Sequence, residues 1–117
     1  MKIIYSNKRT EKLCEDYSKA NKEFGSIVAG RLFDLLNAIE AFTNLYDLFV
    51  LPQYRLHALK GDRANQYSFV IHKGYKWRLI VYPLDGNGNI LKDKNNEKEL
   101  LVKAVMVEIL EVSEHYD

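Results

Sequence analysis

The chain has 117 residues, with 17 Lys and Arg against 16 Asp and Glu, and its formal net charge at pH 7 is +1. This length predicts a single domain over residues 1–117, and a hydrophobic content of 47% suffices for one core. The apolar runs are far shorter than the ~20 residues of a membrane span, and the N-terminus lacks the apolar region of a signal peptide. The single cysteine, Cys14, excludes an internal disulfide. We therefore expect a protein of a reducing compartment, the cytoplasm.

The N-terminal half is patterned as helices after one short strand, which is predicted over residues 2–6. A first helix ending at Gly25 is indicated by apolar residues at helical spacing, namely Leu13, Tyr17, Ala20 and Phe24. A second helix, from Ser26 to about Asn44, is indicated in the same way by Val28, Leu32, Leu36, Ile39 and Phe42. The turn between them is so short that we expect an antiparallel helical hairpin.

After Pro52 the apolar period changes to two, which is typical of strands. Residues 67–72 and 77–82 predict a β-hairpin with one apolar face and one face that carries Arg78 and Tyr82. Residues 84–100 predict a polar hairpin loop, and residues 103–113 predict a long last strand. Helices followed by strands predict an α+β fold, in which an N-terminal antiparallel helix pair packs on a twisted, mainly antiparallel β-sheet.

Positive charge is concentrated between residues 54 and 82. This stretch carries six Lys and Arg residues and one acid, Asp62, so its local charge is +5 and the rest of the chain sums to −4. We expect the positive charge of the chain to be in this one place, as is typical of a surface that binds phosphates. The charged members are Arg55, Lys60, Arg63, Lys73, Lys76 and Arg78, with His57 and His72 as titratable additions.

The sequence contains no nucleotide-binding, metalloprotease or serine-hydrolase motif, and its three histidines lack metal-ligand spacing. We therefore expect no metal and no cofactor, and acid–base and electrostatic chemistry on a phosphodiester remains. Metal-free RNA cleavage needs a base for the 2′-OH, cations for the phosphorane charge and an acid for the leaving 5′ oxygen. The candidate cations are Lys60, Arg63 and Arg78, and the candidate proton carriers are His57, His115 and Tyr116, with Glu114 beside them.

Each candidate also has a structural explanation, which the residues alone leave open. His57 could be a half-buried histidine whose hydrogen bonds are satisfied within the fold. Lys60 and Arg63 could be ordinary turn charges beside a glycine, and Arg78 could belong to a structural ion pair within its strand. The C-terminal residues could be a disordered tail.

Three segments together resemble the core of the HigB toxins, which belong to the RelE superfamily. They are residues 56–63 (LHALKGDR), 66–69 (QYSF) and 76–79 (KWRL). The resemblance implies the toxin of a type II toxin–antitoxin system, a ribosome-dependent endoribonuclease that cuts mRNA in the A site by 2′-OH attack. It also implies three partners: mRNA, the small ribosomal subunit, and a helix-turn-helix, HigA-like antitoxin that forms a hetero-oligomer with the toxin.

The same resemblance implies the residues of the site. The chain ends in Glu114–Asp117, which resembles the acidic and aromatic end of HigB with the acid and the histidine exchanged. The residues implied to line the catalytic site are His57, Lys60, Arg78 and Tyr116, with Arg63 and His115 as further members. The RNA-binding residues are expected to be Arg55, Lys73, Lys76 and Glu114. Two alternatives stay open, a ParE-like gyrase-inhibiting toxin on the same scaffold and a non-catalytic RNA-binding protein.

Overall fold

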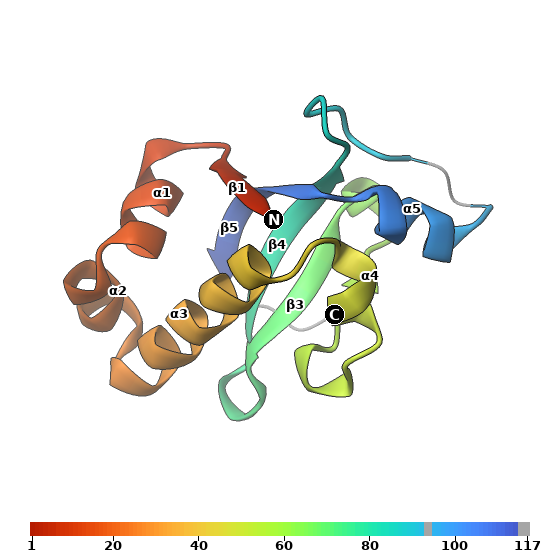
Figure 1. Cartoon of the computed structure of the whole chain (residues 1–117). Helices are drawn as coiled ribbons and strands as arrows, with labels where there is room; N and C mark the ends of the chain where they lie inside the picture. The colour runs from red at the N-terminus through yellow and green to blue at the C-terminus, as the bar shows by residue number, and fades with distance from the viewer. Residues whose placement is uncertain (93–94, 115–117) are drawn as a thin grey trace.

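A computed structural model describes residues 1–92 and 95–114 of the chain (Figure 1). Its strands form one five-stranded sheet in the order β1-β5-β4-β3-β2. β1 runs parallel to β5, whereas the other neighbouring strands pair antiparallel. The strands are β1 (Lys2–Tyr5), β2 (His57–Ala58), β3 (Tyr67–His72), β4 (Trp77–Leu84) and β5 (Met106–Ser113).

The helices precede the central strands, except for one short helix before β5. Figure 1 shows the chain leaving β1 through α1 and α2 and returning through α3, which packs against β3. No helix in residues 1–92 and 95–114 is both long and apolar enough to cross a membrane. The helices are α1 (Lys8–Glu15), α2 (Tyr17–Phe24), α3 (Ser26–Ala41), α4 (Leu45–Phe49) and α5 (Glu97–Lys103), with 3₁₀ turns η1 (Pro52–Tyr54), η2 (Gly61–Arg63) and η3 (Lys73–Tyr75).

The predicted α+β architecture is confirmed, but the first predicted helix is two helices. Asp16 has an extended backbone, with φ −123° and ψ 101°, and its carboxylate accepts a hydrogen bond from the Lys19 amide at 3.2 Å. The apolar spacing continues across this break, so periodicity could not reveal it. The second predicted helix ends at Ala41 and not near Asn44, because Asn44 caps α4 by accepting a bond from the Asp47 amide at 3.1 Å.

The region from residue 84 to 103 also differs from the prediction. The polar turn exists, since Asp85 accepts hydrogen bonds from the amides of Asn87 and Asn89 at 2.9 and 3.0 Å. The chain then forms α5, and the last strand begins at Met106 instead of Lys103. Leu101 of α5 is fully buried in the core and α5 packs on α4. Tertiary burial therefore determines this helix, which has too few residues to show a period of its own.

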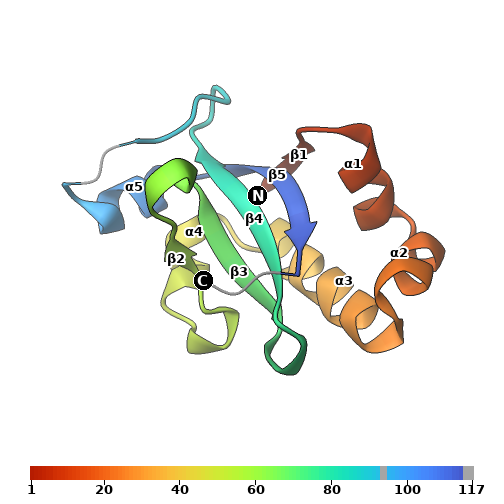
Figure 2. The same ribbon diagram turned by 180° about the vertical axis from the view of Figure 1, so that it is seen from behind.

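The apolar core lies between the helices and one face of the sheet, and it includes Phe69, Leu79 and Ile109. Figure 2 shows the other face of the sheet, with the strands in front of α3. We call it the open face. Strand register places on it His57, Ser68, Val70, Arg78, Ile80, Tyr82, Glu108, Glu111 and Ser113. Arg78 and Tyr82 share this face, as the alternation predicted. The open face also carries apolar residues, and β3 is buried on both sides.

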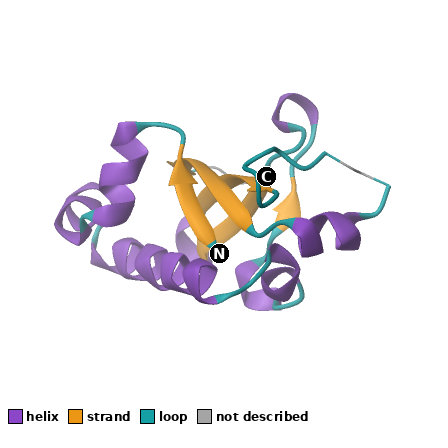
Figure 3. Ribbon diagram, turned by 45° about the horizontal axis from the view of Figure 1, so that its top comes forward, coloured by secondary structure: helices purple, strands orange, loops and turns teal. Residues whose placement is uncertain are grey.

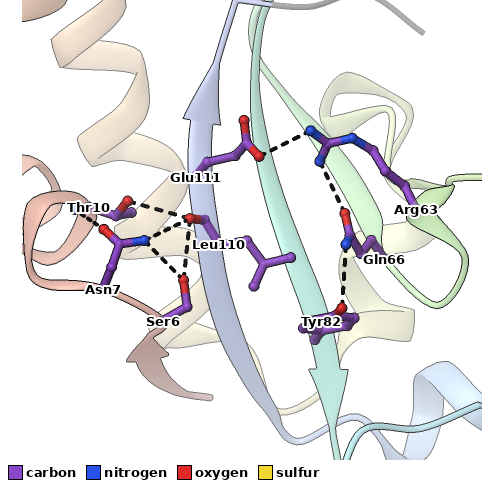
Figure 4. Close-up of polar contacts among 8 residues, drawn as sticks. All are labelled: Ser6, Asn7, Thr10, Arg63, Gln66, Tyr82, Leu110 and Glu111. Atoms are coloured by element: carbon purple, nitrogen blue, oxygen red, sulfur yellow. Dashed lines mark hydrogen bonds and ion pairs between the residues drawn. The ribbon is translucent and has the colours of Figure 1, made fainter.

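A bulge in β5 connects the sheet to α1. The pairing of β5 with β4 shifts by one residue in mid-strand. The Leu110 carbonyl there accepts hydrogen bonds from side chains of Ser6, Asn7 and Thr10 at 3.3 to 3.5 Å (Figure 4). Asn7 also caps α1, because its side chain accepts a bond from the Thr10 amide at 2.8 Å. The irregular point of the strand thereby fixes where the first helix begins.

The buried thiol of Cys14 makes stability depend on alkaline pH. Burial, and then the charge of Glu15, raises its pKa from 9.0 to about 12. Above pH 9 the unfolded thiol therefore loses its proton while the folded thiol keeps it. We expect the free energy of unfolding to fall between about pH 9 and 12, by up to ~1.4 kcal/mol per pH unit.

Urea denaturation of the parent and of Cys14→Ala at about pH 8 and pH 10 measures this effect. The parent should lose about 1 kcal/mol more than Cys14→Ala between the two pH values. The constant cost of the cavity in Cys14→Ala cancels in this difference. Equal losses in the two proteins would show that the thiol titrates alike in the folded and unfolded states.

Candidate functional site

Strand pairing brings the centre of the candidate site together on the open face. His57 pairs with Ser68, Ser68 with Ile80, and Ile80 with Glu111, so these residues form one row across four strands. Arg78 lies two residues from Ile80 along β4 and therefore on the same face. From strand spacings of ~4.8 Å and rises of ~3.3 Å per residue, the Cα atoms of His57 and Arg78 are roughly 12 Å apart. Their side chains can reach one phosphate group between them.

The ring of His57 is oriented by the backbone. Its Nδ1 lies 2.8 Å from the carbonyl oxygen of Arg55, and the side chain is half-buried. A carbonyl can only accept, so Nδ1 carries the proton in this contact and Nε2 is the basic nitrogen of the neutral ring. A histidine held in this tautomer can take a proton from a bound hydroxyl group.

Arg63 reaches from η2 across the open face to β5 (Figure 4). Its Nη2 donates to the Glu111 carboxylate at 3.1 Å, and its Nη1 donates to the Gln66 side-chain oxygen at 3.1 Å. Gln66 in turn donates to the Tyr82 hydroxyl at 3.4 Å. The side chains of the Arg63–Glu111 ion pair are 37% and 41% exposed. Such a pair contributes little to stability and can be exchanged for another anion.

Arg78 and Lys60 occupy different environments. Arg78 is half-buried in the open face, and its Nη1 donates to the Trp77 carbonyl at 3.0 Å. Lys60 is exposed immediately before η2 and lines a pocket of about 360 Å³ beside β2. Tyr67 and Glu97 line the same pocket. Arg78 therefore lies within the open face, whereas Lys60 borders a pocket that it shares with Tyr67, whose side chain faces the helix side of the sheet.

The predicted RNA-binding cations lie at the other end of the open face from η2. Lys73 and Lys76 are exposed in the turn between β3 and β4, and Arg55 is exposed just before β2. His72 has a structural role there, because its Nδ1 accepts a hydrogen bond from the Gly74 amide at 3.1 Å. Cations thus border both ends of the open face, and His57 lies on its edge strand β2.

The predicted C-terminal members of the site fall at the limit of the structure. Glu114 is exposed and follows Ser113, which pairs with Arg78, so β5 ends beside that arginine. His115 and Tyr116 lie outside the described residues, and their roles stay predictions.

Other titratable groups lie away from the open face. Burial, followed by its hydrogen bond and charge interaction with Glu97, raises the pKa of Tyr67, whose hydroxyl donates to that carboxylate at 2.8 Å. Tyr67 is therefore a neutral hydrogen-bond donor on the helix side of the sheet. Within the described part of the chain, no group of three or more His, Cys, Asp and Glu could hold a metal ion.

The sequence did not reveal the interactions of four polar residues on the open face. Gln66 and Glu111 meet only through Arg63, and Glu111 is 48 residues from Arg63 along the chain. Tyr82 was placed on the Arg78 face, but its bond with Gln66 was not foreseen. Ser68 is fully buried, and its hydroxyl has no hydrogen-bond partner in the structure described. Unsatisfied buried groups are rare in native proteins, so Ser68 marks this point of the open face as unusual.

Comparison with known proteins places this fold. No family model matches the sequence, and no curated protein matches it. The solved structure of a YoeB/ParE toxin from Agrobacterium tumefaciens matches with a TM-score of 0.53 and 18% sequence identity, over 99% of this chain and 100% of that chain. At this identity the likeness shows the fold alone, and it supports the RelE-like α+β fold expected from the sequence.

The unsatisfied hydroxyl of Ser68 predicts that its removal does not weaken the fold. Burying a hydroxyl without a partner costs ~1–3 kcal/mol, so Ser68→Ala should leave the free energy of unfolding unchanged or raise it by about 1 kcal/mol. Thr10→Val is the control, because the buried Thr10 hydroxyl bonds to the Leu110 carbonyl at 3.5 Å. That variant should lose about 1 kcal/mol in urea denaturation. A comparable loss in Ser68→Ala would mean that its hydroxyl is bonded in solution.

Proposed function

We propose that this protein is the toxin of a type II toxin–antitoxin system, resembles HigB, and cleaves mRNA in the ribosomal A site. Two features support the proposal. A solved structure that shares its fold is described as a toxin. The open face carries cations around a histidine, as RNA cleavage without a metal requires.

The observation that carries the proposal is the position of His57 and Arg78 on neighbouring rows of one face. The backbone carbonyl of Arg55 sets the tautomer of His57, so its Nε2 can act as a base. Arg78 supplies a permanent positive charge and a planar set of donors that match a phosphate. A base and a fixed cation around one phosphodiester are the minimum set for this reaction.

In the proposed reaction, Nε2 of His57 takes the proton of the 2′-OH and the 2′ oxygen bonds to phosphorus. The bond from phosphorus to the 5′ oxygen breaks, and the products are a 2′,3′-cyclic phosphate and a 5′-OH. Arg78 offsets the charge that develops on the phosphorane, assisted by Lys60 and Arg63. Tyr116, with His115, is proposed to supply the proton for the leaving oxygen.

Arg63 must exchange partners to take part. It is bonded to Glu111 and Gln66 in the free protein, and a phosphate would replace the Glu111 carboxylate. A phosphate accepts two parallel bonds from a guanidinium, as a carboxylate does, so the exchange conserves the bond type.

The proposed partners follow from the same function. Arg55, Lys73 and Lys76 would contact the mRNA backbone at the β3–β4 end of the open face, with Glu114 nearby. The small ribosomal subunit would present the A-site codon, and a helix-turn-helix antitoxin similar to HigA would neutralise the toxin in a hetero-oligomer.

A second function is a ParE-like toxin that inhibits gyrase, and its support is the YoeB/ParE description of the structural neighbour. A fold shared by both kinds of toxin does not separate them. The open face favours cleavage, because inhibition of gyrase by binding would not require a base and a cation on one phosphodiester. A non-catalytic RNA-binding protein would use the same cations without the histidine.

The test of the proposed function is the mapping of mRNA ends by primer extension after expression in growing cells. The parent should arrest growth and produce discrete cuts within codons, and Arg78→Ala should lose the cuts, by about a hundredfold or more. Arg31→Ala removes an exposed arginine from α3 on the helix side and is the matched control. Growth arrest with DNA damage and uncut mRNA would support the gyrase function instead.

The same assay with purified ribosomes tests the attacking group. A message with one 2′-deoxynucleotide at the cut position should bind and remain intact, since the substrate's own 2′-OH is the nucleophile. Cutting of that message, or a 5′-phosphate on the product, would show attack by water and contradict the mechanism.

The Arg63–Glu111 ion pair predicts that Glu111 competes with RNA. Glu111→Gln should tighten binding of a short single-stranded RNA by about two- to fivefold, because an exposed pair is worth ~0.2–1 kcal/mol. Glu99→Gln is the control, since it removes an acid that pairs with Lys103 at 2.9 Å on α5. Fluorescence anisotropy measures both affinities. An equal gain in both variants would show an effect of net charge alone, without competition at Arg63.

A further inference from the structure

A pocket opens at the edge of the sheet that β2 forms, between the segment after β2 and α5. It has a volume of about 360 Å³. Figure 2 shows β2 and α5 at the same end of the molecule. The walls are largely apolar, and their apolar residues are Ala58, Leu59, Ala64, Leu91 and Leu100. Pockets of this size and character typically bind small organic groups, which a few polar side chains hold in place.

One hydrogen-bonded pair of side chains supplies an acceptor in the pocket. The Tyr67 hydroxyl donates to a carboxylate oxygen of Glu97 at 2.8 Å, and both residues line the pocket. Burial, and then the contact with Glu97, raises the pKa of Tyr67, so its hydroxyl keeps the proton that it donates. The two oxygens of a carboxylate offer about four acceptor positions, and the tyrosine occupies one. Glu97, whose side chain is exposed, can therefore accept further hydrogen bonds from a ligand.

Two lysines give the pocket a second kind of recognition group. Lys60 and Lys92 line it and are exposed. Among the described residues, Glu97 bonds to Tyr67 and forms no ion pair with either lysine. The two lysines and the glutamate give the lining a net charge of +1. Such a pocket suits a ligand that offers both hydrogen-bond donors for the acid and an anionic group for the lysines.

Guanine nucleotides combine these properties. The Watson–Crick edge of guanine carries two neighbouring donors, N1–H and N2–H, which match the two oxygens of a carboxylate. Adenine, cytosine and uracil lack such a pair, because an acceptor lies beside their donors. The base has apolar faces for the leucine and alanine walls, and a phosphate suits the lysines. A guanidinium from a protein partner would also match a carboxylate, but two lysines disfavour a cation.

We propose that this pocket binds a guanine nucleotide, with the base on Glu97 and the phosphate at Lys60 and Lys92. Two sources present this chemistry, a free nucleotide and a guanosine within an RNA strand. Tyr67 belongs to the core on the helix side of the sheet, and α5 lies at the opposite end of the molecule from α1 and α2 (Figure 3). The pocket is therefore distinct from the open face, although Lys60 belongs both to it and to the proposed catalytic set. Only the strand as a source rests on the proposed function.

Glu97→Gln tests the contact with the base, and Glu99→Gln on the same helix is the matched control. The amide that Glu97→Gln introduces keeps an oxygen that can accept from Tyr67, so the bond within the fold is retained. It replaces the second carboxylate oxygen by an NH₂ donor, which opposes the donors of guanine. Glu99 does not line the pocket and pairs with Lys103. Thermal denaturation establishes that both variants fold like the parent.

Isothermal titration calorimetry measures the affinity of the parent and both variants for GMP, IMP and AMP. IMP lacks the N2 amine, so the parent should bind GMP at least about tenfold more tightly than IMP, and AMP no more tightly than IMP. In Glu97→Gln the preference for GMP over IMP should fall to about twofold or less, whereas Glu99→Gln should keep it. Equal affinity of the parent for GMP and IMP, or the same change in both variants, would overturn the proposal.

Lys92→Gln tests the contact with the phosphate, since Lys92 is outside the proposed catalytic set. This variant should bind GMP about three- to tenfold more weakly than the parent does, and its affinity for guanosine should be unchanged. Lys98→Gln removes an exposed lysine of α5 that does not line the pocket, and it should change neither affinity. An equal loss for GMP and guanosine in Lys92→Gln would contradict a phosphate at this lysine and overturn the assignment of a nucleotide.

Two short uridine RNAs separate the sources. One carries a single 2′-deoxyguanosine, and the other carries 2′-deoxyinosine at the same position. Tighter binding of the first RNA, lost in Glu97→Gln, would assign the pocket to a guanosine within a strand. Equal binding of the two RNAs, with the preference for GMP retained, would assign it to a free nucleotide. The proposed function fails separately, through uncut mRNA with the parent protein, and that result would leave the preference for guanine unaffected.

Discussion

Side chains of a β-strand point alternately to the two faces of a sheet, and here the helices occupy one of those faces. Phe69, Leu79 and Ile109 point toward the helices and provide buried area in the core. Their neighbours in the strands must point the other way, and Arg78 is among them. Because the helix side provides the stabilising burial, the open face can carry groups that do not improve stability, such as the exchangeable pair of Arg63 and Glu111.

The bulge at Leu110 is what keeps this division of faces intact along β5. Ile109 faces the core, so strict alternation would turn Glu111 toward the core as well, where an unpaired carboxylate would be very costly. The extra residue reverses the phase, and Glu111 lies opposite Ile80 on the open face. The carbonyl that the bulge releases from the ladder bonds to side chains at the start of α1. One irregularity therefore positions both an acid of the candidate site and the first helix.

The periodicity of apolar residues predicted the elements that have a regular pattern of their own. The hairpin of β3 and β4 and the body of α3 have strong patterns, and both exist in the structure. The break at Asp16 leaves the apolar spacing unchanged, and the bulge at Leu110 shifts it by only one residue. The pattern of apolar residues therefore does not reveal either feature. α5 is too short to have a period. The face of the sheet on which Arg78 lies could be predicted from alternation. The ion pair of Arg63 and Glu111 could not, because it depends on how segments distant in sequence come together in the sheet.

The ion pair of Arg63 and Glu111 determines what the open face would gain from a polyanion. On the open face, Arg63 already has a carboxylate partner, so a phosphate gains only the difference between two similar bonds. Under the proposed function, that exchange would favour an RNA that also satisfies Arg78 and His57 over one that offers charge alone.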